Sequence, residues 1–129
     1  MYTQDNKKMK MLIVDDDSLC RTILNEVCKE YGECFSAISG TEALEYITQM
    51  VIPFKVIFLD IMMPEMNGIE TLIAIREKEK EHNLPQAKII VCTALDDISH
   101  VIKAFQNGCD GYIQKPLDKR EVLRFLPEV

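Results

Sequence analysis

Short apolar runs recur along the chain and are separated by longer segments of mixed polarity. There are five such runs, at residues 11–14, 34–38, 56–59, 89–92 and 112–113. The first, third and fourth runs are continuously apolar, which is typical of parallel strands covered on both faces. We therefore predict five short strands, of which these three are buried on both faces.

Helical periodicity occupies the segments between the runs. In residues 18–31 the apolar side chains form one broad stripe, which is the pattern of an amphipathic helix. Residues 41–50, 69–82, 98–107 and 119–126 show a similar pattern. The strict alternation of strand and helix predicts an α/β fold in which helices cover both faces of a parallel sheet.

Local signals mark the expected helix ends. Three helix starts carry a capping side chain that is followed three residues later by Glu, as in a capping box. These pairs are Ser39/Glu42, Asn67/Glu70 and Asp118/Glu121. Gly32 and Gly108 stand where a left-handed residue would end a helix, and Pro127 is expected to close the last helix.

Length and charge limit the class of protein. The chain has 129 residues, 47% of them hydrophobic, which fits one domain with a substantial core. We expect a flexible leader at residues 1–9 and a single domain at residues 10–129. The net charge is −6 and no run of Lys and Arg exceeds two residues, so direct binding to nucleic acid or to a membrane is not expected. The start of the chain lacks the apolar core of a secretory signal, so we expect a cytoplasmic protein.

The cysteines agree with that location. Their number is five, which is odd, and they are scattered without a CxxC motif or a Cys/His cluster. This distribution favours reduced thiols that pack as small hydrophobic side chains over disulfides or a zinc site. It also disfavours a redox role for any one of them, without excluding it.

Chemically reactive side chains follow four of the predicted strands. They are an Asp run at residues 15–17 after the first strand, Asp60 after the third, Thr93 after the fourth and Lys115 after the fifth. Ligands of open parallel sheets bind outside the carboxyl ends of the strands. We therefore expect these side chains to meet at one edge of the sheet.

The carboxylates in this group call for a cation. Two carboxylates about 4 Å apart repel by about 4 kcal/mol at an effective dielectric near 20. Mg²⁺ suits such a group because it takes one or two carboxylates and keeps several waters. The Asp run could instead form a turn or a helix cap, and for Asp17 we prefer that interpretation. For Asp15 and Asp16 we prefer metal binding, because a turn does not explain Asp60.

One of these carboxylates can act as a nucleophile toward phosphorus once a cation is present. Phosphoryl transfer needs in-line positioning and neutralised charge on the phosphoryl oxygens. Lys115 would supply a second positive charge and the Thr93 hydroxyl one hydrogen bond. A single Lys is usually a solvated surface residue and a single Thr usually a strand former. Their joint placement at successive strand ends favours the functional interpretation.

Four motifs in chain order carry a family resemblance. They are VDD at residues 14–16, LDIMMPEMNG at residues 59–68, TA at residues 93–94 and KP at residues 115–116. This set resembles the motifs of bacterial two-component response-regulator receiver domains of the chemotaxis-regulator type, and the resemblance runs from about residue 10 to residue 126. It implies a flavodoxin-like (βα)5 fold, a doubly wound parallel five-stranded sheet with strand order 2-1-3-4-5.

The resemblance also implies roles for the acidic residues. Asp60 would be the phospho-acceptor. Asp16 and Asp60 would ligate Mg²⁺ directly together with the backbone carbonyl of Met62, and Asp15 would act through water.

Further roles follow from the same resemblance. Thr93 and Lys115 would hold the phosphoryl oxygens, and the Lys115–Pro116 peptide bond would be cis. Tyr112 matches an aromatic switch residue that responds to a movement of Thr93, although an ordinary strand aromatic is the alternative. Leu19 would either contact a phosphodonor protein or pack within the domain.

Two positions bear on the lifetime of the phosphorylated state. In the family, the residue two after the acceptor and the residue two after the threonine influence hydrolysis of the acyl phosphate. Here they are Met62 and Leu95, neither of which can orient a water by hydrogen bonding. We therefore expect a long-lived phosphorylated state.

The expected function is a phosphorylation-dependent signalling switch of a phosphorelay. A histidine kinase or a histidine phosphotransfer protein would donate the phosphoryl group. The surface of the fourth helix, fifth strand and fifth helix, at residues 97–107 and 112–126, would then engage a downstream partner or output domain, or form a homodimer. Such a domain is a regulatory phospho-acceptor and not an enzyme, since it catalyses only its own phosphorylation and dephosphorylation.

Three other functions fit the sequence less well. A Mg²⁺-dependent phosphatase would need an acid two residues after its nucleophile, where Met62 stands. A flavin carrier would need a phosphate loop after the first strand, where the Asp run would repel a phosphate. A docking module without phosphorylation does not explain the complete set of acids, hydroxyl and amine. Whether the chain is a standalone regulator or the receiver of a hybrid kinase stays open.

Overall fold

The computed structural model describes residues 9–49, 53–63, 66–94 and 97–127 of the chain. Five parallel strands form one sheet in the order β2-β1-β3-β4-β5. The strands are β1 (Met9–Val14), β2 (Gly32–Ala37), β3 (Val56–Asp60), β4 (Lys88–Thr93) and β5 (Gly111–Gln114). The predicted flavodoxin-like architecture and strand order are confirmed.

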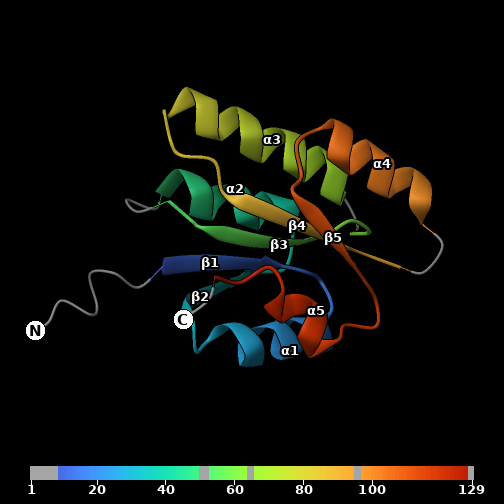
Figure 1. The fold of residues 1–129 in the computed structure, drawn as a ribbon. Coiled ribbons are helices and arrows are strands. Elements are labelled where there is room, and N and C mark those ends of the chain that lie inside the picture. The colour runs from blue at the N-terminus through green and yellow to red at the C-terminus, as the bar shows by residue number, and fades with distance from the viewer. Residues whose placement is uncertain (1–8, 50–52, 64–65, 95–96, 128–129) are drawn as a thin grey trace, which may run out of the picture.

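Five helices alternate with the strands and cover both faces of the sheet (Figure 1). They are α1 (Ser18–Cys28), α2 (Gly40–Gln49), α3 (Gly68–Glu81), α4 (Ile98–Gln106) and α5 (Lys119–Leu123). Helices α1 and α5 lie together on one face, and α2, α3 and α4 lie on the other (Figure 1). In the described residues no helix has both the length and the apolar character that a membrane span requires.

The core consists of two clusters, one on each face of the sheet. Because successive side chains of a strand point to opposite faces, the continuously apolar strands contribute to both clusters. Leu12 and Leu59, for example, pack under α2 and α3, whereas Ile13 and Phe58 pack under α1 and α5. This explains why the first, third and fourth runs lack the alternation of a half-exposed strand.

Two helices end earlier than their apolar pattern predicts. Helix α1 ends at Cys28 and not near Tyr31, whose amide instead donates to the Cys28 carbonyl at 2.8 Å in a turn. Helix α5 ends at Leu123, before Leu126, because the amides of Phe125 and Leu126 bond to carbonyls three residues back. Pro127 therefore does not close that helix. Tyr31 and Leu126 still pack on the core, so the apolar pattern continues beyond the ends of both helices.

Of the two glycines expected to end helices, one has the left-handed conformation and the other does not. Gly108 has the expected left-handed φ of +100°, but Gly32 does not and instead begins β2. A Cβ at Gly32 would lie 2.3 Å from the Met9 carbonyl oxygen, so close packing against β1 requires the glycine. Strand β1 in turn begins at Met9, one residue before the predicted start of the domain.

The predicted capping pairs are formed to different extents. Asn67 and Glu70 make a complete capping box at α3. At α2 the Ser39 hydroxyl accepts from the Glu42 amide at 3.1 Å, but the Glu42 carboxylate accepts from Ile38 and not from Ser39. At α5 the Asp118 side chain caps the helix by accepting from the Arg120 amide at 2.8 Å.

Candidate functional site

The predicted site residues lie together at the carboxyl edge of the sheet. Asp60 is the last residue of β3 and Thr93 the last of β4, while Asp15 and Lys115 directly follow β1 and β5. The strands are in register there, with Val14 opposite Leu59 and Asp60 opposite Cys92. A carboxylate oxygen from each of Asp15, Asp16 and Asp60 lies within 4.8 Å of the other two. The sequence prediction that these residues converge is confirmed.

The members of the acid cluster differ in burial. Asp15 is 1% exposed and Asp60 is 3% exposed, whereas Asp16 faces solvent. Two buried carboxylates beside each other are costly, because each loses hydration and they repel one another. The exposed Asp16 leaves the cluster open on one side, so an ion can enter from solvent.

The backbone around Asp15 is held firmly. Its Oδ1 accepts from the Asp17 amide at 2.9 Å, and its own amide donates to the Ala37 carbonyl at 3.0 Å. Arg21 of α1 donates from Nη1 to the Asp15 carbonyl oxygen at 2.7 Å. Asp17 caps α1 by accepting from the Leu19 amide at 3.0 Å, as predicted. These contacts fix the loop that carries the acids.

One oxygen of this cluster lacks a hydrogen bond. Asp15 Oδ2 is buried and has no hydrogen-bond partner among the described residues, although Lys115 Nζ lies 3.1 Å away as a counter-charge. Buried carboxylate oxygens normally accept hydrogen bonds, so this one is available to a ligand. Three carboxylates with an unsatisfied oxygen among them form a donor set that fits a hard divalent cation such as Mg²⁺.

Asp60 has a perturbed acidity. Its Oδ1 accepts from the Met62 amide at 3.2 Å and lies 3.4 Å from Lys115 Nζ. Burial, followed by the negative charge of Asp15, raises the pKa of Asp60 from 3.8 to about 7, although Lys115 partly opposes this shift. In the absence of a metal, Asp60 is therefore close to half-protonated at neutral pH.

The ammonium of Lys115 offsets part of the negative charge of the acid cluster. Burial lowers its pKa, but the carboxylates of Asp60 and Asp15 raise it by more, so the net shift is upward and the ammonium keeps its charge. Its amide donates to the Thr93 carbonyl at 2.7 Å, which ties the end of β5 to that of β4. The Lys115–Pro116 peptide bond is cis, as the family resemblance implies.

Thr93 and Tyr112, the expected switch pair, are in contrasting environments. Thr93 is buried, and among the described residues its hydroxyl makes one hydrogen bond, a long one of 3.4 Å to the Ala94 carbonyl. Tyr112 is 45% exposed, and its ring packs edge-to-face against Phe105 of α4 with centroids 6.3 Å apart. The Tyr112 ring is therefore in an outward position in this structure.

Some relevant residues were not found by sequence reasoning. Arg21 was missed, although it lies one helical turn after the cap residue Asp17 and so returns to the same side of α1. Leu19 is exposed, which agrees with one of its two predicted roles, and so are Ile38 and Met62 on neighbouring loops. Leu95 and Pro64 lie outside the described residues.

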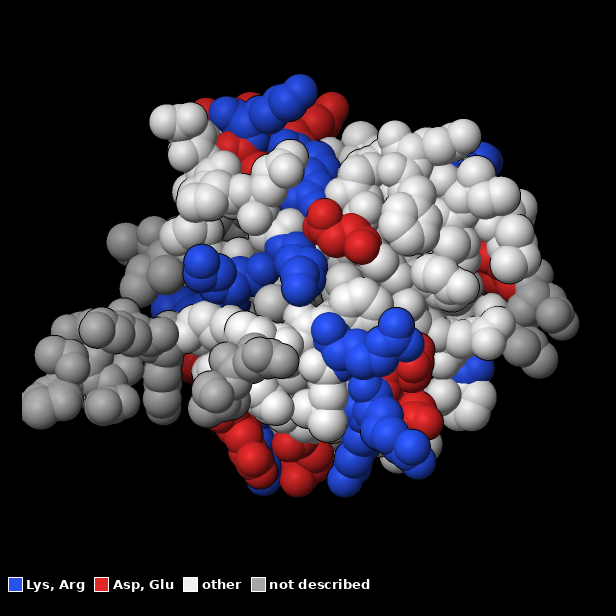
Figure 2. All heavy atoms as spheres, in the orientation of Figure 1, with Lys and Arg blue, Asp and Glu red and all other residues white. Residues whose placement is uncertain are grey.

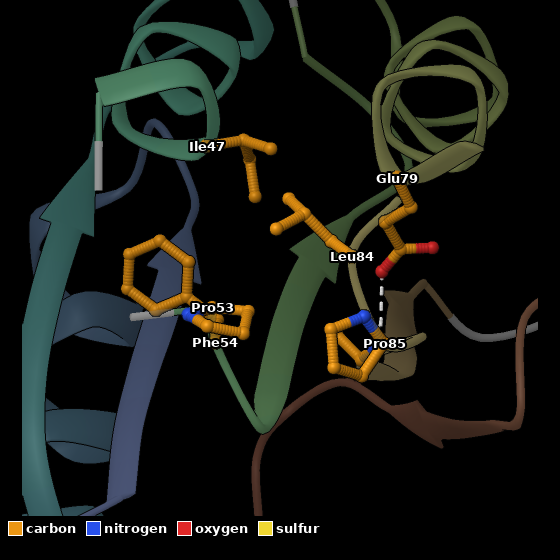
Figure 3. A pocket seen from close by; sticks show the side chains of 7 residues that line it. Ile47, Pro53, Phe54, Glu79, Leu84 and Pro85 are labelled. Carbon is orange, nitrogen blue, oxygen red and sulfur yellow. Dashed lines mark hydrogen bonds between the residues drawn. The ribbon is translucent and has the colours of Figure 1, made fainter. Parts of the chain in front are cut away.

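A hollow at the opposite edge of the sheet is not a comparable site (Figure 3). Its volume is about 10 Å³, which is room for at most one water molecule. The one carboxylate among its described lining residues, Glu79, is fully paired. It accepts from the Ala87 amide at 2.7 Å (Figure 3), and its other oxygen accepts from Arg76 Nη1 at 2.7 Å. The other lining residues are apolar: Ile47, Pro53, Phe54, Leu84, Pro85 and Ala87.

Comparison with known proteins identifies the class to which this fold and site belong. Residues 11–126 match the response regulator receiver domain family, and the chain belongs to that family. It is therefore a phosphorylation-dependent switch domain of two-component signalling, with a regulatory phospho-acceptor role.

Individual relatives show the contexts in which such domains occur. The chain is 33% identical over 120 residues to the chemotaxis protein CheY of Listeria monocytogenes, covering 92% of this chain and 95% of that protein. It is 38% identical over 123 residues to the hybrid signal transduction histidine kinase L of Dictyostelium discoideum, covering 92% of this chain but only 7% of the kinase. Receiver domains thus occur both alone and within longer proteins.

A solved structure supports the same fold. The chemotaxis protein CheY4 of Vibrio cholerae superposes with a TM-score of 0.79 at 25% identity, and the match covers 91% of this chain and 94% of that one. The agreement extends over nearly the whole domain.

Proposed function

We propose that Asp60 accepts a phosphoryl group from the phosphohistidine of a histidine kinase or a histidine phosphotransfer protein, with Mg²⁺ bound beside it. The observation that carries this proposal is the convergence of the Asp15, Asp16 and Asp60 carboxylates, one buried oxygen of which lacks a hydrogen bond, next to the ammonium of Lys115. Asp60 is the favoured acceptor because it ends the central strand β3 and has a carboxylate oxygen within 4.8 Å of one from the exposed Asp16.

The residues that would hold Mg²⁺ are Asp16, Asp60 and the backbone carbonyl of Met62 directly, and Asp15 through water. The ion supplies positive charge that neutralises phosphoryl oxygens. A cation near Asp60 also lowers the pKa of that carboxyl, which favours the ionised form that attacks phosphorus.

The chain's own groups have distinct roles in the transfer. An Asp60 oxygen forms a bond to phosphorus while the bond between phosphorus and the donor histidine nitrogen breaks, and the histidine leaves with that electron pair. Lys115 and the Thr93 hydroxyl then donate to the phosphoryl oxygens. The long hydrogen bond of Thr93 is weak, so exchanging it for one to the phosphoryl group costs little.

The movement of Thr93 would change the surface formed by α4, β5 and α5. Tyr112, next to Thr93's strand, is held outward against Phe105, and its inward turn would uncover that ring. This surface carries few charges over α4 and β5, and basic side chains gather over α5 (Figure 2). Its exposed apolar residues suit contact with a downstream partner or a second copy: Ile98, Ile102, Phe105, Tyr112 and Leu123.

Self-dephosphorylation is expected to be slow. Met62 is exposed two residues after Asp60 and has no group that orients a water by hydrogen bonding. The phosphorylated state should therefore persist longer than in a Met62→Asn variant.

Phosphorylation by acetyl phosphate in Mg²⁺, followed by intact mass, tests this proposal. We expect one phosphoryl adduct in the wild type and none in Asp60→Asn or in EDTA. Asp17→Asn is the matched control, because Asn also caps a helix and the acid cluster stays complete. An adduct on Asp60→Asn, or none with either acetyl phosphate or a phosphohistidine donor, would overturn the assignment. Decay no faster in Met62→Asn than in the wild type would contradict the lifetime argument alone.

A further inference from the structure

Two cysteines from different elements face the same core cluster at the far end of α1 from the acids. Cys28 is the last residue of α1 and is fully buried, whereas Cys34 lies in β2 and is half-buried. Both pack on the cluster between the sheet and helices α1 and α5. All five cysteines lie in the described part of the chain, and Cys34 is the one that is not buried.

The chain between them is a short turn. Helix α1 packs directly against β2, and the Tyr31 amide donates to the Cys28 carbonyl at 2.8 Å to reverse the chain direction. Strand β2 is an edge strand of the sheet, and the Cys34 side chain is only half-buried, so a small molecule can reach its thiol. Cys28 stands at a helix end, where the backbone adjusts more easily than within a helix.

The electrostatics of the pair differ from those of the other cysteines. A hydrogen bond with Cys28 lowers the pKa of Cys34, and the same bond, with burial, raises the pKa of Cys28. By contrast, burial raises the pKa of Cys20 to about 11 and also raises that of Cys109. Cys34 is thus a partly exposed thiol with a second, buried thiol beside it, which is the arrangement of an oxidisable cysteine next to a resolving one.

We propose that Cys28 and Cys34 form a modification site, in which a hydroperoxide oxidises Cys34 and Cys28 then closes an intrachain disulfide. This site is separate from the acid cluster and does not depend on phosphorylation.

The chemistry balances with hydrogen peroxide as the oxidant. The Cys34 thiolate attacks one peroxide oxygen, the O–O bond breaks, and the products are a sulfenic acid and hydroxide, which takes up the thiol proton to become water. The Cys28 sulfur then attacks the Cys34 sulfur, the S–O bond breaks, and a second water leaves with the Cys28 proton. Overall, two thiols and one peroxide give one disulfide and two waters, and the protein loses two hydrogen atoms.

Peptide mapping after treatment with hydrogen peroxide tests the proposal directly. Trypsin cuts after Arg21 and Lys29, so Cys20, Cys28 and Cys34 fall on three different peptides. In the wild type we expect the Cys28 and Cys34 peptides to be joined, the intact mass to fall by two hydrogens, and dithiothreitol to reverse both changes. Cys109→Ser, which alters a thiol in the other core cluster, should behave like the wild type.

Single variants separate the two steps. Cys28→Ser should accumulate a Cys34 sulfenic acid that dimedone traps, and Cys34→Ser should neither cross-link nor react with dimedone at Cys28. Circular dichroism confirms that each variant is folded, and Cys34→Ala replaces Cys34→Ser if the latter is not. Joining through another cysteine, a disulfide-linked dimer, stable oxygen addition at Cys34 of the wild type, or no reaction would each overturn the proposal.

Discussion

Buried acids occur at both edges of the sheet, but only one of the two groups is fully paired. At the amino edge, Glu79 of α3 accepts from the Ala87 amide and from Arg76, each at 2.7 Å. At the carboxyl edge, one Asp15 oxygen has no hydrogen-bond partner in the described part of the chain, and Asp60 relies there on one amide and the shared charge of Lys115. Both groups are buried, so burial alone does not distinguish them.

The Arg76 guanidinium accounts for most of the difference in hydrogen bonding between the two groups of acids. Besides Glu79, it donates to the Gly108 carbonyl at 2.8 and 3.1 Å and pairs with Asp110 at 3.0 Å. Asp110 in turn accepts from the Ile89 amide at 2.8 Å. A network of this kind fixes α3, β4 and the start of β5 to one another, and both oxygens of the buried Glu79 carboxylate are already paired within it. The acid cluster at the other edge is less well satisfied in the absence of a cation, which is the property that a binding site needs.

The largest expected effect is the loss of stability when the buried ion pair between Arg76 and Glu79 is removed. Arg76→Met keeps the apolar stem but leaves Glu79 buried without its counter-charge. Removing one member of a buried pair typically costs about 3 kcal/mol or more. We expect a loss of about 3 kcal/mol in the free energy of unfolding, measured by urea denaturation, with phosphorylation of the folded variant retained.

An exposed pair provides the matched control. Arg124 and Glu121 lie 2.9 Å apart on α5, and the Arg124 side chain is 71% exposed. Arg124→Met should change the free energy of unfolding by less than about 0.5 kcal/mol. Equal losses in the free energy of unfolding of Arg76→Met and Arg124→Met would show that burial of the Arg76 network contributes nothing to stability.

The second prediction concerns the free energy of unfolding in the absence of metal. Whereas Arg76→Met should destabilise the protein, Asp60→Asn should stabilise it. The folded-state pKa of about 7 lies above the ordinary value of 3.8, so the folded protein binds a proton more tightly than the unfolded chain. Stability is therefore lost as pH rises from about 4 to about 7 and is level above that range. Asp60→Asn removes this penalty, so in EDTA at pH 8 it should be more stable than the wild type by about 2 kcal/mol, an amount reduced by the loss of the Lys115 partner.

The pH dependence of that difference is the critical measurement. Urea denaturation in EDTA should show the stabilisation by Asp60→Asn shrinking toward zero near pH 4. A variant less stable than the wild type at pH 8 would mean that the carboxylate is well satisfied without a cation.

The smallest expected effect is the stabilisation of the folded protein by bound Mg²⁺. At ten times its dissociation constant, an ion that binds only the folded state stabilises it by about 1.4 kcal/mol. We expect a rise in the melting temperature of the wild type and of Arg76→Met, and a much smaller rise in Asp16→Asn. Equal shifts in all three proteins would place the ion elsewhere.

Sequence alone supplied the architecture and the acid cluster, for identifiable reasons. Continuous apolar runs mark buried strands, and the ends of parallel strands must share an edge, so Asp15, Asp60, Thr93 and Lys115 could be brought together without coordinates. The family resemblance supplied the strand order and the cis bond before Pro116. The part of the site that involves Leu95 stays a prediction, as do the ligand role of the Met62 carbonyl and the domain boundary at residue 10.

The parts that sequence did not supply depend on contacts between distant residues. Arg76, Glu79 and Asp110 look like ordinary charges of solvated helix and loop positions. Arg76 and Glu79 are only three residues apart, but the bond that joins Arg76 to Asp110 spans 34 residues of the chain. Gly32 was assigned to a helix end because both a left-handed residue and a close approach require glycine, and sequence does not distinguish the two. The pairing of Cys28 with Cys34 likewise depends on how α1 packs on β2.

The anchoring of Gly108 by Arg76 has a mechanical consequence for α4. Gly108 directly follows the C-terminal cap of this helix and is held through its carbonyl, whereas at the other end the Asp97 side chain accepts from no backbone amide of the first helical turn and pairs with the side chain of His100 in that turn. We therefore expect α4 to pivot near Gly108 and to move mainly at its N-terminal end, which follows β4 and Thr93 in the chain. A displacement at that end should then move Ile98 further than Phe105, which lies close to Gly108.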